Sequence, residues 1–147
     1  MRRSRVGDEP EDRAPEACTV PASSETPLPA TVGAARDRVT ALLTRFGIPS
    51  DRRVVTDALM ITSELVTNAI RHGGGLTAFD ACIRGGVLRL LVADNSPVHP
   101  FTQTGEAPGI RIGGYGWPLV QSLADLVTVT PHGAGKQIAA HLALPYS

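Results

Sequence analysis

The spacing of apolar residues changes from a helical to a strand period within one short stretch, and this change restricts the fold more than any other feature. Residues 51–72, "DRRVVTDALMITSELVTNAIRH", repeat apolar side chains at helical spacing and then meet three consecutive glycines. The segments "LTAFDACIR" and "VLRLLVAD" that follow alternate with period two, and the hairpin signal Gly85-Gly86 separates them. The predicted core face of the helix is Val54, Ala58, Ile61, Leu65 and Ala69.

The remaining elements extend this arrangement of helix and sheet. Residues 31–47 predict an earlier helix, whose apolar face is Ala35, Val39, Leu42, Leu43 and Phe46. Ser50 or Asp51 is expected to cap the helix that follows. After a long loop, a short helix and two strands are predicted at residues 117–125, 126–130 and 136–144. This order predicts an α+β two-layer sandwich, with a mixed, mostly antiparallel sheet and helices packed on one face.

The N-terminal segment differs in composition from the rest of the chain. Residues 1–30 are rich in Pro, Glu, Arg and Ser and poor in large apolar side chains, which predicts a disordered tail with at most a short edge strand near Cys18. The rest, residues 31–147, is long enough for one domain. Its irregular segment at residues 96–116 has a length typical of a functional lid or of disorder.

Charge, hydropathy and cysteine usage argue against several classes of protein. The formal net charge is zero, so the charge does not favour a nucleic-acid partner. No apolar run approaches the ~18 residues of a membrane span, and the N-terminus lacks the apolar stretch of a secretory signal. Cys18 and Cys82 are far apart without a CxxC partner, which favours a cytoplasmic chain with reduced cysteines and Cys82 as a packing residue.

Glu64 and Asn68 are the first candidates for chemistry. They lie one turn apart, so both project from one side of the long helix, beside its apolar face. A carboxylate there is costly unless it is paired or coordinates a ligand. The amide oxygen of Asn68 suits Mg²⁺, and Glu64 could accept a proton from an attacking water or hydroxyl. The alternative, which this pair alone favours, is an ordinary helix edge with two solvated polar residues.

Two further motifs follow along the chain. Asp94 ends the second strand on its apolar face, where an inward carboxylate could accept from the exocyclic amino group of adenine; the alternative is an Asx-type turn. Gly113, Gly114 and Gly116 precede the short helix, whose free N–H groups could face phosphates; the alternative is a lid hinge. The four histidines lack metal-ligand spacing, which argues against a zinc site.

The three motifs occur in a fixed order and together resemble the histidine-kinase-like (GHKL, Bergerat-type) ATP-binding fold of gyrase B, a heat-shock chaperone, mismatch-repair ATPases and histidine kinases. "SELVTNAIRHGGG" resembles its N box, "VADNSP" its first glycine box and "GGYGWPLV" its second. The similarity covers roughly residues 31–144 and is strongest to the single-domain anti-sigma-factor serine/threonine kinases and their actinobacterial relatives.

The resemblance implies ATP and Mg²⁺ as cofactors and a role for individual residues. Glu64 matches the proposed general base, Asn68 the magnesium ligand and Asp94 the adenine-binding aspartate. Further nucleotide-binding positions are matched by His72, Gly73, Gly114 and Gly116. In that family the first helix helps to form the partner and dimer surface, so Arg36 is a candidate partner contact, the alternative being a solvated charge.

The sequence departs from the family pattern around the glycine boxes, at Ser96, Tyr115, Trp117, Pro118 and Gln137. Ser96 replaces a glycine near the adenine, and Gln137 stands where the family tends to have threonine. These substitutions alter the edges of the pocket and leave Glu64, Asn68 and Asp94 in place. Trp117 is interpreted as a packing residue.

Three functions follow from this pattern. The first is a kinase that phosphorylates a serine on a small anti-sigma antagonist protein. The second is an ATP-binding module that sequesters a sigma factor or another regulator with little transfer, and the third is a degenerate fold without nucleotide. A histidine autokinase is not expected, because no phosphoacceptor helix pair precedes the N box. The resemblance also implies a possible homodimer.

Overall fold

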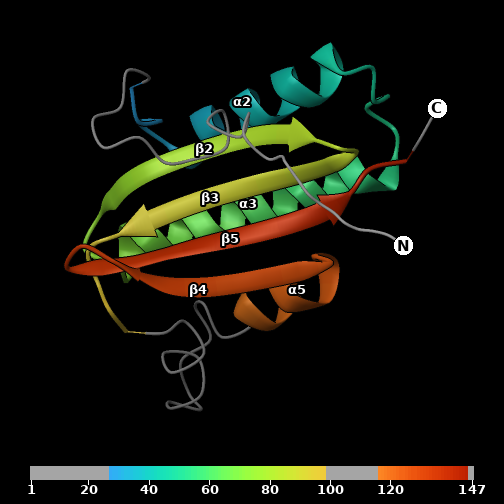
Figure 1. Ribbon diagram of the computed structural model, residues 1–147. Coiled ribbons are helices and arrows are strands. Elements are labelled where there is room, and N and C mark those ends of the chain that lie inside the picture. The colour runs from blue at the N-terminus through green and yellow to red at the C-terminus, as the bar shows by residue number, and fades with distance from the viewer. Residues whose placement is uncertain (1–26, 99–115, 146–147) are drawn as a thin grey trace.

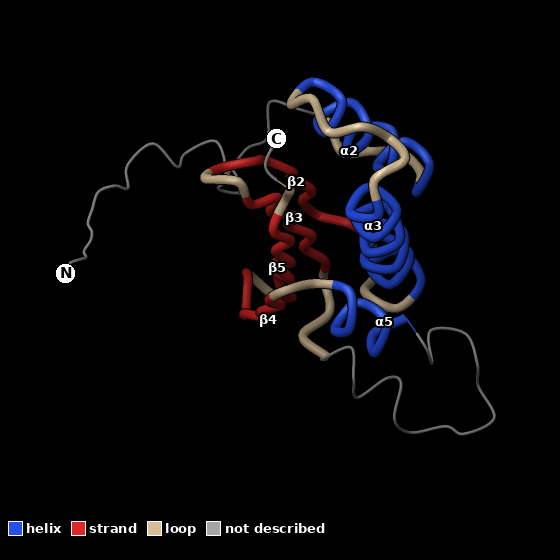
Figure 2. The backbone as a smooth tube through the Cα atoms, turned by 90° about the vertical axis from the view of Figure 1, so that its right-hand side faces the viewer, coloured by secondary structure: helices blue, strands red, loops and turns tan. Residues whose placement is uncertain are grey.

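The computed structural model describes residues 27–98 and 116–145, which form a layer of helices packed on one face of a β-sheet (Figure 1, Figure 2). The elements in chain order are α2 (Val32–Arg45), α3 (Arg53–Arg71), β2 (Leu76–Arg84), β3 (Val87–Asp94), α5 (Gly116–Leu123), β4 (Leu126–His132) and β5 (Gly135–Ala143). The predicted α+β two-layer fold is therefore confirmed. The predicted tail lies outside the described residues, except for its last four.

The order of the strands brings distant parts of the chain together. The sheet order is β2-β3-β5-β4, and every pairing among these four strands is antiparallel, so the parallel component of the predicted mixed sheet is not found in the described ranges. Gly85 and Gly86 turn β2 into β3 with φ angles of 58° and 78°, which the tightest hairpin turn requires. Strand β5 returns along β3, so that Lys136 pairs with Asp94.

The core lies between the sheet and α3, the middle one of the three described helices (Figure 2). Leu88, Leu90 and Val92 of β3 belong to this core, as the period-two pattern predicted. The buried residues of α3 are Val55, Ala58, Ile61, Thr62, Leu65, Val66 and Ala69. The apolar face predicted for α3 is thus confirmed, with Val54 partly buried at its margin.

Two predictions at helix ends are wrong. The side chain of Phe46 is 54% exposed, because α2 ends at Arg45 and the chain leaves the core face at its C-cap. Neither Ser50 nor Asp51 caps α3, whose N-cap is Arg52 with no side-chain hydrogen bond. The Arg52 N–H donates to the Pro49 carbonyl over 3.1 Å, so both residues lie inside a turn that leads into the helix.

Cys82 forms a disulfide in the structure, so the prediction of a reduced thiol is wrong. The only other cysteine of the sequence, Cys18, lies outside the described residues. Separation along the sequence does not limit approach in space, which explains why spacing failed to indicate the bond. Among the helices of the described ranges, none has the length and apolar character needed to cross a membrane.

Candidate functional site

The C-terminal end of α3 and the end of β3 meet at Gly73 and Asp94. Asp94 follows Val92 on the face of β3 that packs on the helices. A Cβ atom on Gly73 would lie 2.3 Å from Asp94 Oδ2, and the Asn95 N–H donates to the Gly73 carbonyl over 2.8 Å. The Asp94 side chain therefore occupies the space beside Gly73, and only glycine allows this approach.

The Asp94 carboxylate is 5% exposed and is held from two sides. Oδ1 accepts the Ser96 N–H over 3.0 Å, so the Asx-type turn and the inward-facing carboxylate, considered as alternatives, occur together. The Lys136 ammonium lies 3.1 Å from Oδ1 and 2.9 Å from Oδ2, and it donates to the Ser96 carbonyl over 3.0 Å. The charge of the buried carboxylate is compensated within the protein.

Lys136 is the residue of this site that the sequence interpretation missed. It is the only lysine among the fourteen basic residues of the chain, and it is 4% exposed. A signal was present, because Lys136 has the same parity in its strand as the core residues Ile138, Ala140 and Leu142. A charged residue on an apolar strand face requires a partner, and the position of that partner is not readable from the strand itself.

Glu64 contacts the first residue of α5. A Cβ atom on Gly116 would lie 2.2 Å from Glu64 Oε1, so the start of α5 is pressed against the carboxylate. Glu64 and Asn68 are both half-buried, and the Asn68 carbonyl accepts the N–H groups of His72 and Gly73 over 2.8 and 3.0 Å. The helix edge that carries Glu64 and Asn68 is therefore partly covered, unlike an ordinary solvated face.

These contacts arrange the polar side chains in a row along the C-terminal half of α3. Glu64 and Gly73 are nine residues apart, which corresponds to roughly 13 Å along the helix axis. Glu64 marks one end, beneath α5, and Asp94 marks the other, beside Gly73. The row runs from Glu64, for which the described part of the chain gives no ion-pair partner, to the compensated carboxylate of Asp94, with Asn68 between them in the sequence.

The other predicted site residues are placed as follows. His72 is the exposed C-cap of α3. Arg36 is exposed on α2 and donates to Ser63 Oγ over 2.7 Å. Ser63 directly precedes Glu64 in the sequence. Trp117 is 4% exposed and belongs to the hydrophobic core, which confirms its interpretation as a packing residue. Gly114 lies outside the described residues.

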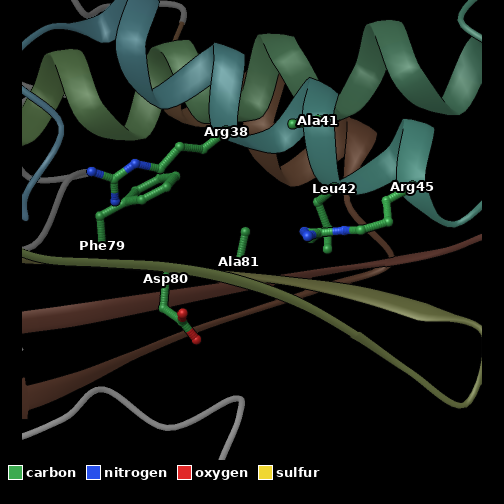
Figure 3. Close-up of a pocket in the computed structure, with 7 residues that line it drawn as sticks. All are labelled: Arg38, Ala41, Leu42, Arg45, Phe79, Asp80 and Ala81. Carbon is green, nitrogen blue, oxygen red and sulfur yellow. The ribbon is translucent and has the colours of Figure 1, made fainter. Parts of the chain in front are cut away.

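A cavity of about 360 Å³ lies between α2 and β2, apart from this row (Figure 3). Its lining is Arg38, Ala41, Leu42, Arg45, Phe79, Asp80 and Ala81. Phe79 points toward α2, whereas Asp80 points away from it (Figure 3). Burial raises the pKa of the Asp80 carboxyl above its usual value, although the Ala81 N–H and the charge of Arg89 act in the opposite direction. Because none of the predicted site residues lines it, this cavity is not part of the candidate site.

Replacing Gly73 with alanine should destabilise the protein by about 1–3 kcal/mol, the usual cost of overpacking a rigid site. The added Cβ atom would meet three side-chain atoms of Asp94 at 2.3 to 2.7 Å, and Lys136 prevents that side chain from moving away. Urea denaturation measures the loss. Gly33→Ala is the control, because its Cβ would meet only Thr31 Oγ1, at 3.7 Å. Equal free energies of unfolding for the Gly73→Ala and Gly33→Ala variants would show that Asp94 leaves room for a Cβ atom at Gly73.

The sequence model of the histidine kinase-like ATPase domain matches residues 26–141, which is most of the chain and includes every described strand except the last residues of β5. No curated protein matches the chain. The match agrees with the α+β fold of the described residues. The chain therefore belongs to the family of histidine kinase-like ATPase domains.

Proposed function

We propose that the protein binds Mg·ATP along α3 and transfers the γ-phosphoryl group to a serine of a small antagonist protein. Membership of an ATPase domain family implies ATP binding. The observation that carries the proposal is the pair of glycine contacts, because Gly73 and Gly116 lack room for a Cβ atom beside Asp94 and Glu64. Glycine at both positions lets the end of α3 and the start of α5 approach the two acids closely, which brings backbone and carboxylates together at one site.

Each residue of the row has a role that its chemistry supports. Asp94 accepts a hydrogen bond from the exocyclic amino group of adenine, beside Gly73 and His72. Asn68 offers Mg²⁺ a neutral oxygen, and this ion prefers few protein ligands together with water and phosphates. The N–H groups at the start of α5, that of Gly116 included, bind the phosphates, and the resemblance assigns the same role to Gly114. Bound Mg²⁺ supplies charge neutralisation of the phosphates, and Glu64 orients or deprotonates the attacking serine.

The proposed partner follows from the same family resemblance as the proposed reaction. An anti-sigma antagonist carrying the acceptor serine, or a sigma factor held without transfer, would dock on α2 beside Arg36, and a second copy of the chain would use the same helix. Arg36 supports this choice because it is exposed and tied to Ser63, one residue before Glu64. A partner that contacts Arg36 would therefore act on Ser63, the residue next to the proposed base in the sequence.

Mg·ATP at 100 times its dissociation constant is expected to stabilise the protein by about 2.7 kcal/mol, since the ligand binds only the folded state. Thermal denaturation with and without nucleotide measures this stabilisation. An arm with EDTA tests the contribution of Mg²⁺, and is expected to show a smaller shift. An unchanged melting temperature at millimolar Mg·ATP, for protein with native circular dichroism, would instead identify a degenerate fold.

A second candidate is an ATP-binding module that holds a regulator without transfer, and the altered glycine boxes favour it. Incubation with labelled ATP, Mg²⁺ and a candidate antagonist separates the two functions. Label on a serine of the antagonist supports the kinase. Nucleotide binding and partner capture without label support the module, whereas label on a histidine of the chain itself would contradict both.

A further inference from the structure

The ion pair between Lys136 and Asp94 determines how many hydrogen bonds the carboxylate has left for a ligand. A lysine ammonium has three N–H donors. Here Asp94 Oδ1, Asp94 Oδ2 and the Ser96 carbonyl accept them over 3.1, 2.9 and 3.0 Å. The donors of Lys136 are therefore accounted for within the protein, and none is left for the edge of a bound base.

The acceptors of Asp94 are also nearly accounted for. An ionised carboxylate has about four lone-pair positions, two on each oxygen. Oδ1 accepts from Lys136 and from the Ser96 N–H, and Oδ2 accepts from Lys136. Within the described residues this leaves one position, and it is on Oδ2, the oxygen that faces Gly73 at the end of α3.

We propose that Lys136 is a specificity-determining residue, which limits Asp94 to one further hydrogen bond and so removes the bidentate contact through which a free carboxylate would favour guanine. This inference rests on the proposed nucleotide site. Adenine presents one donor group, the exocyclic amino group, next to a ring acceptor. Guanine presents two adjacent donors, the ring N–H and the exocyclic amino group, which a carboxylate with both oxygens available accepts in a bidentate arrangement. Lys136 occupies the oxygen that this arrangement needs.

Lysine suits this position better than arginine does. Its ammonium is a compact charge with three donors in a tetrahedral arrangement, whereas the planar guanidinium directs paired donors at one carboxylate. The three acceptors around Lys136 belong to a side chain and to a carbonyl two residues later, and they are not arranged in one fork. The other thirteen of the fourteen lysine and arginine residues are arginines, so the single lysine of the sequence stands at a site that suits this geometry.

The wild-type protein tests the proposal without any substitution. Dissociation constants of Mg·ATP, Mg·GTP and Mg·ITP are measured by isothermal titration calorimetry. Hypoxanthine has the ring N–H of guanine but not the exocyclic amino group, so GTP and ITP differ by the second donor alone. With one free acceptor position, GTP and ITP bind equally, because only one donor of guanine finds an acceptor on Asp94. GTP binding about 10- to 100-fold more tightly than ITP, the value of one hydrogen bond to a charged group, would overturn the proposal.

Substitution of Lys136 provides the reciprocal test. Lys136→Met frees both oxygens of Asp94, and the ratio of GTP to ITP affinity is expected to rise by about 10- to 100-fold. Lys136→Gln retains donors for part of the contacts, so a smaller rise in the ratio of GTP to ITP affinity is expected. It is the variant to use where Lys136→Met does not fold. Thr128→Ala, on the exposed surface of the edge strand β4, is the control and leaves the ratio unchanged. An unchanged ratio in a folded Lys136 variant rejects the role of Lys136.

Failure of this inference is distinguishable from failure of the proposed function. A wild-type protein that binds none of the three nucleotides contradicts the nucleotide site itself. A protein that binds ATP, but whose GTP-to-ITP ratio does not respond to Lys136, retains the proposed function and loses the inference. Because Lys136 is the only lysine, selective ¹³C-lysine labelling yields one side-chain signal, and this signal is expected to keep its ion-paired shift when ATP binds. A shift to that of a free ammonium would overturn the proposal.

Discussion

Replacing Lys136 with methionine is expected to lower the free energy of unfolding by about 3–5 kcal/mol, the usual effect of removing one partner of a buried ion pair. Lys136 and Asp94 are 4% and 5% exposed, and the variant leaves the carboxylate buried without a counter-charge. Methionine fills the space of the lysine stem, so loss of packing contributes little. Urea denaturation followed by circular dichroism measures the change, which remains within the stability of an ordinary domain.

The double variant Asp94→Asn/Lys136→Met separates charge from packing. It removes both charges together, and replacing a buried ion pair by uncharged groups often changes the free energy of unfolding little. The double variant is therefore expected to be more stable than Lys136→Met alone. If it is less stable by the sum of the two single losses, the two residues act independently, and the ion pair does not account for the stability of this site.

Replacing Glu64 with glutamine is expected to reduce phosphoryl transfer by about 10²- to 10⁴-fold, the contribution of a positioned general base. Glutamine has nearly the same shape, so the contact with Gly116 at the start of α5 remains, while the amide cannot accept the proton of the serine. The dissociation constant of Mg·ATP should stay unchanged, because Asp94 and Asn68 are retained. Single-turnover transfer from labelled ATP, with binding measured by calorimetry, distinguishes the two effects.

Asp57 provides the matched control for Glu64. It is an acidic residue two turns earlier on α3, where its half-buried carboxylate pairs with Arg53 at 3.7 Å. Asp57→Asn changes the same charge on the same helix and is expected to leave transfer unchanged. Equal transfer by the Glu64→Gln variant and the wild type would exclude Glu64 as the base, and an equal loss in both variants would indicate a general effect of charge on α3.

The elements of this fold were predictable because each follows from contacts between near neighbours. The helical period of α3 and the period-two pattern of β2 and β3 indicated which faces are buried. The same parity placed Asp94 on the helix side of the sheet, where the structure has it. The errors at Phe46 and Arg52 concern helix ends, where one local hydrogen bond from a turn decides between similar alternatives.

The sequence by itself determined the helices, the hairpin, the core faces and the order of the motifs, since all of these depend on spacing within one element or on one turn. Only the tertiary structure decided that Lys136 lies beside Asp94, that Cys82 is in a disulfide, and that Gly116 contacts Glu64. These pairs join segments far apart in the chain. Their contact depends on the pairing of β5 with β3 and on the packing of α5 against α3. The spacing of residues within one element does not indicate which distant segment will lie next to it.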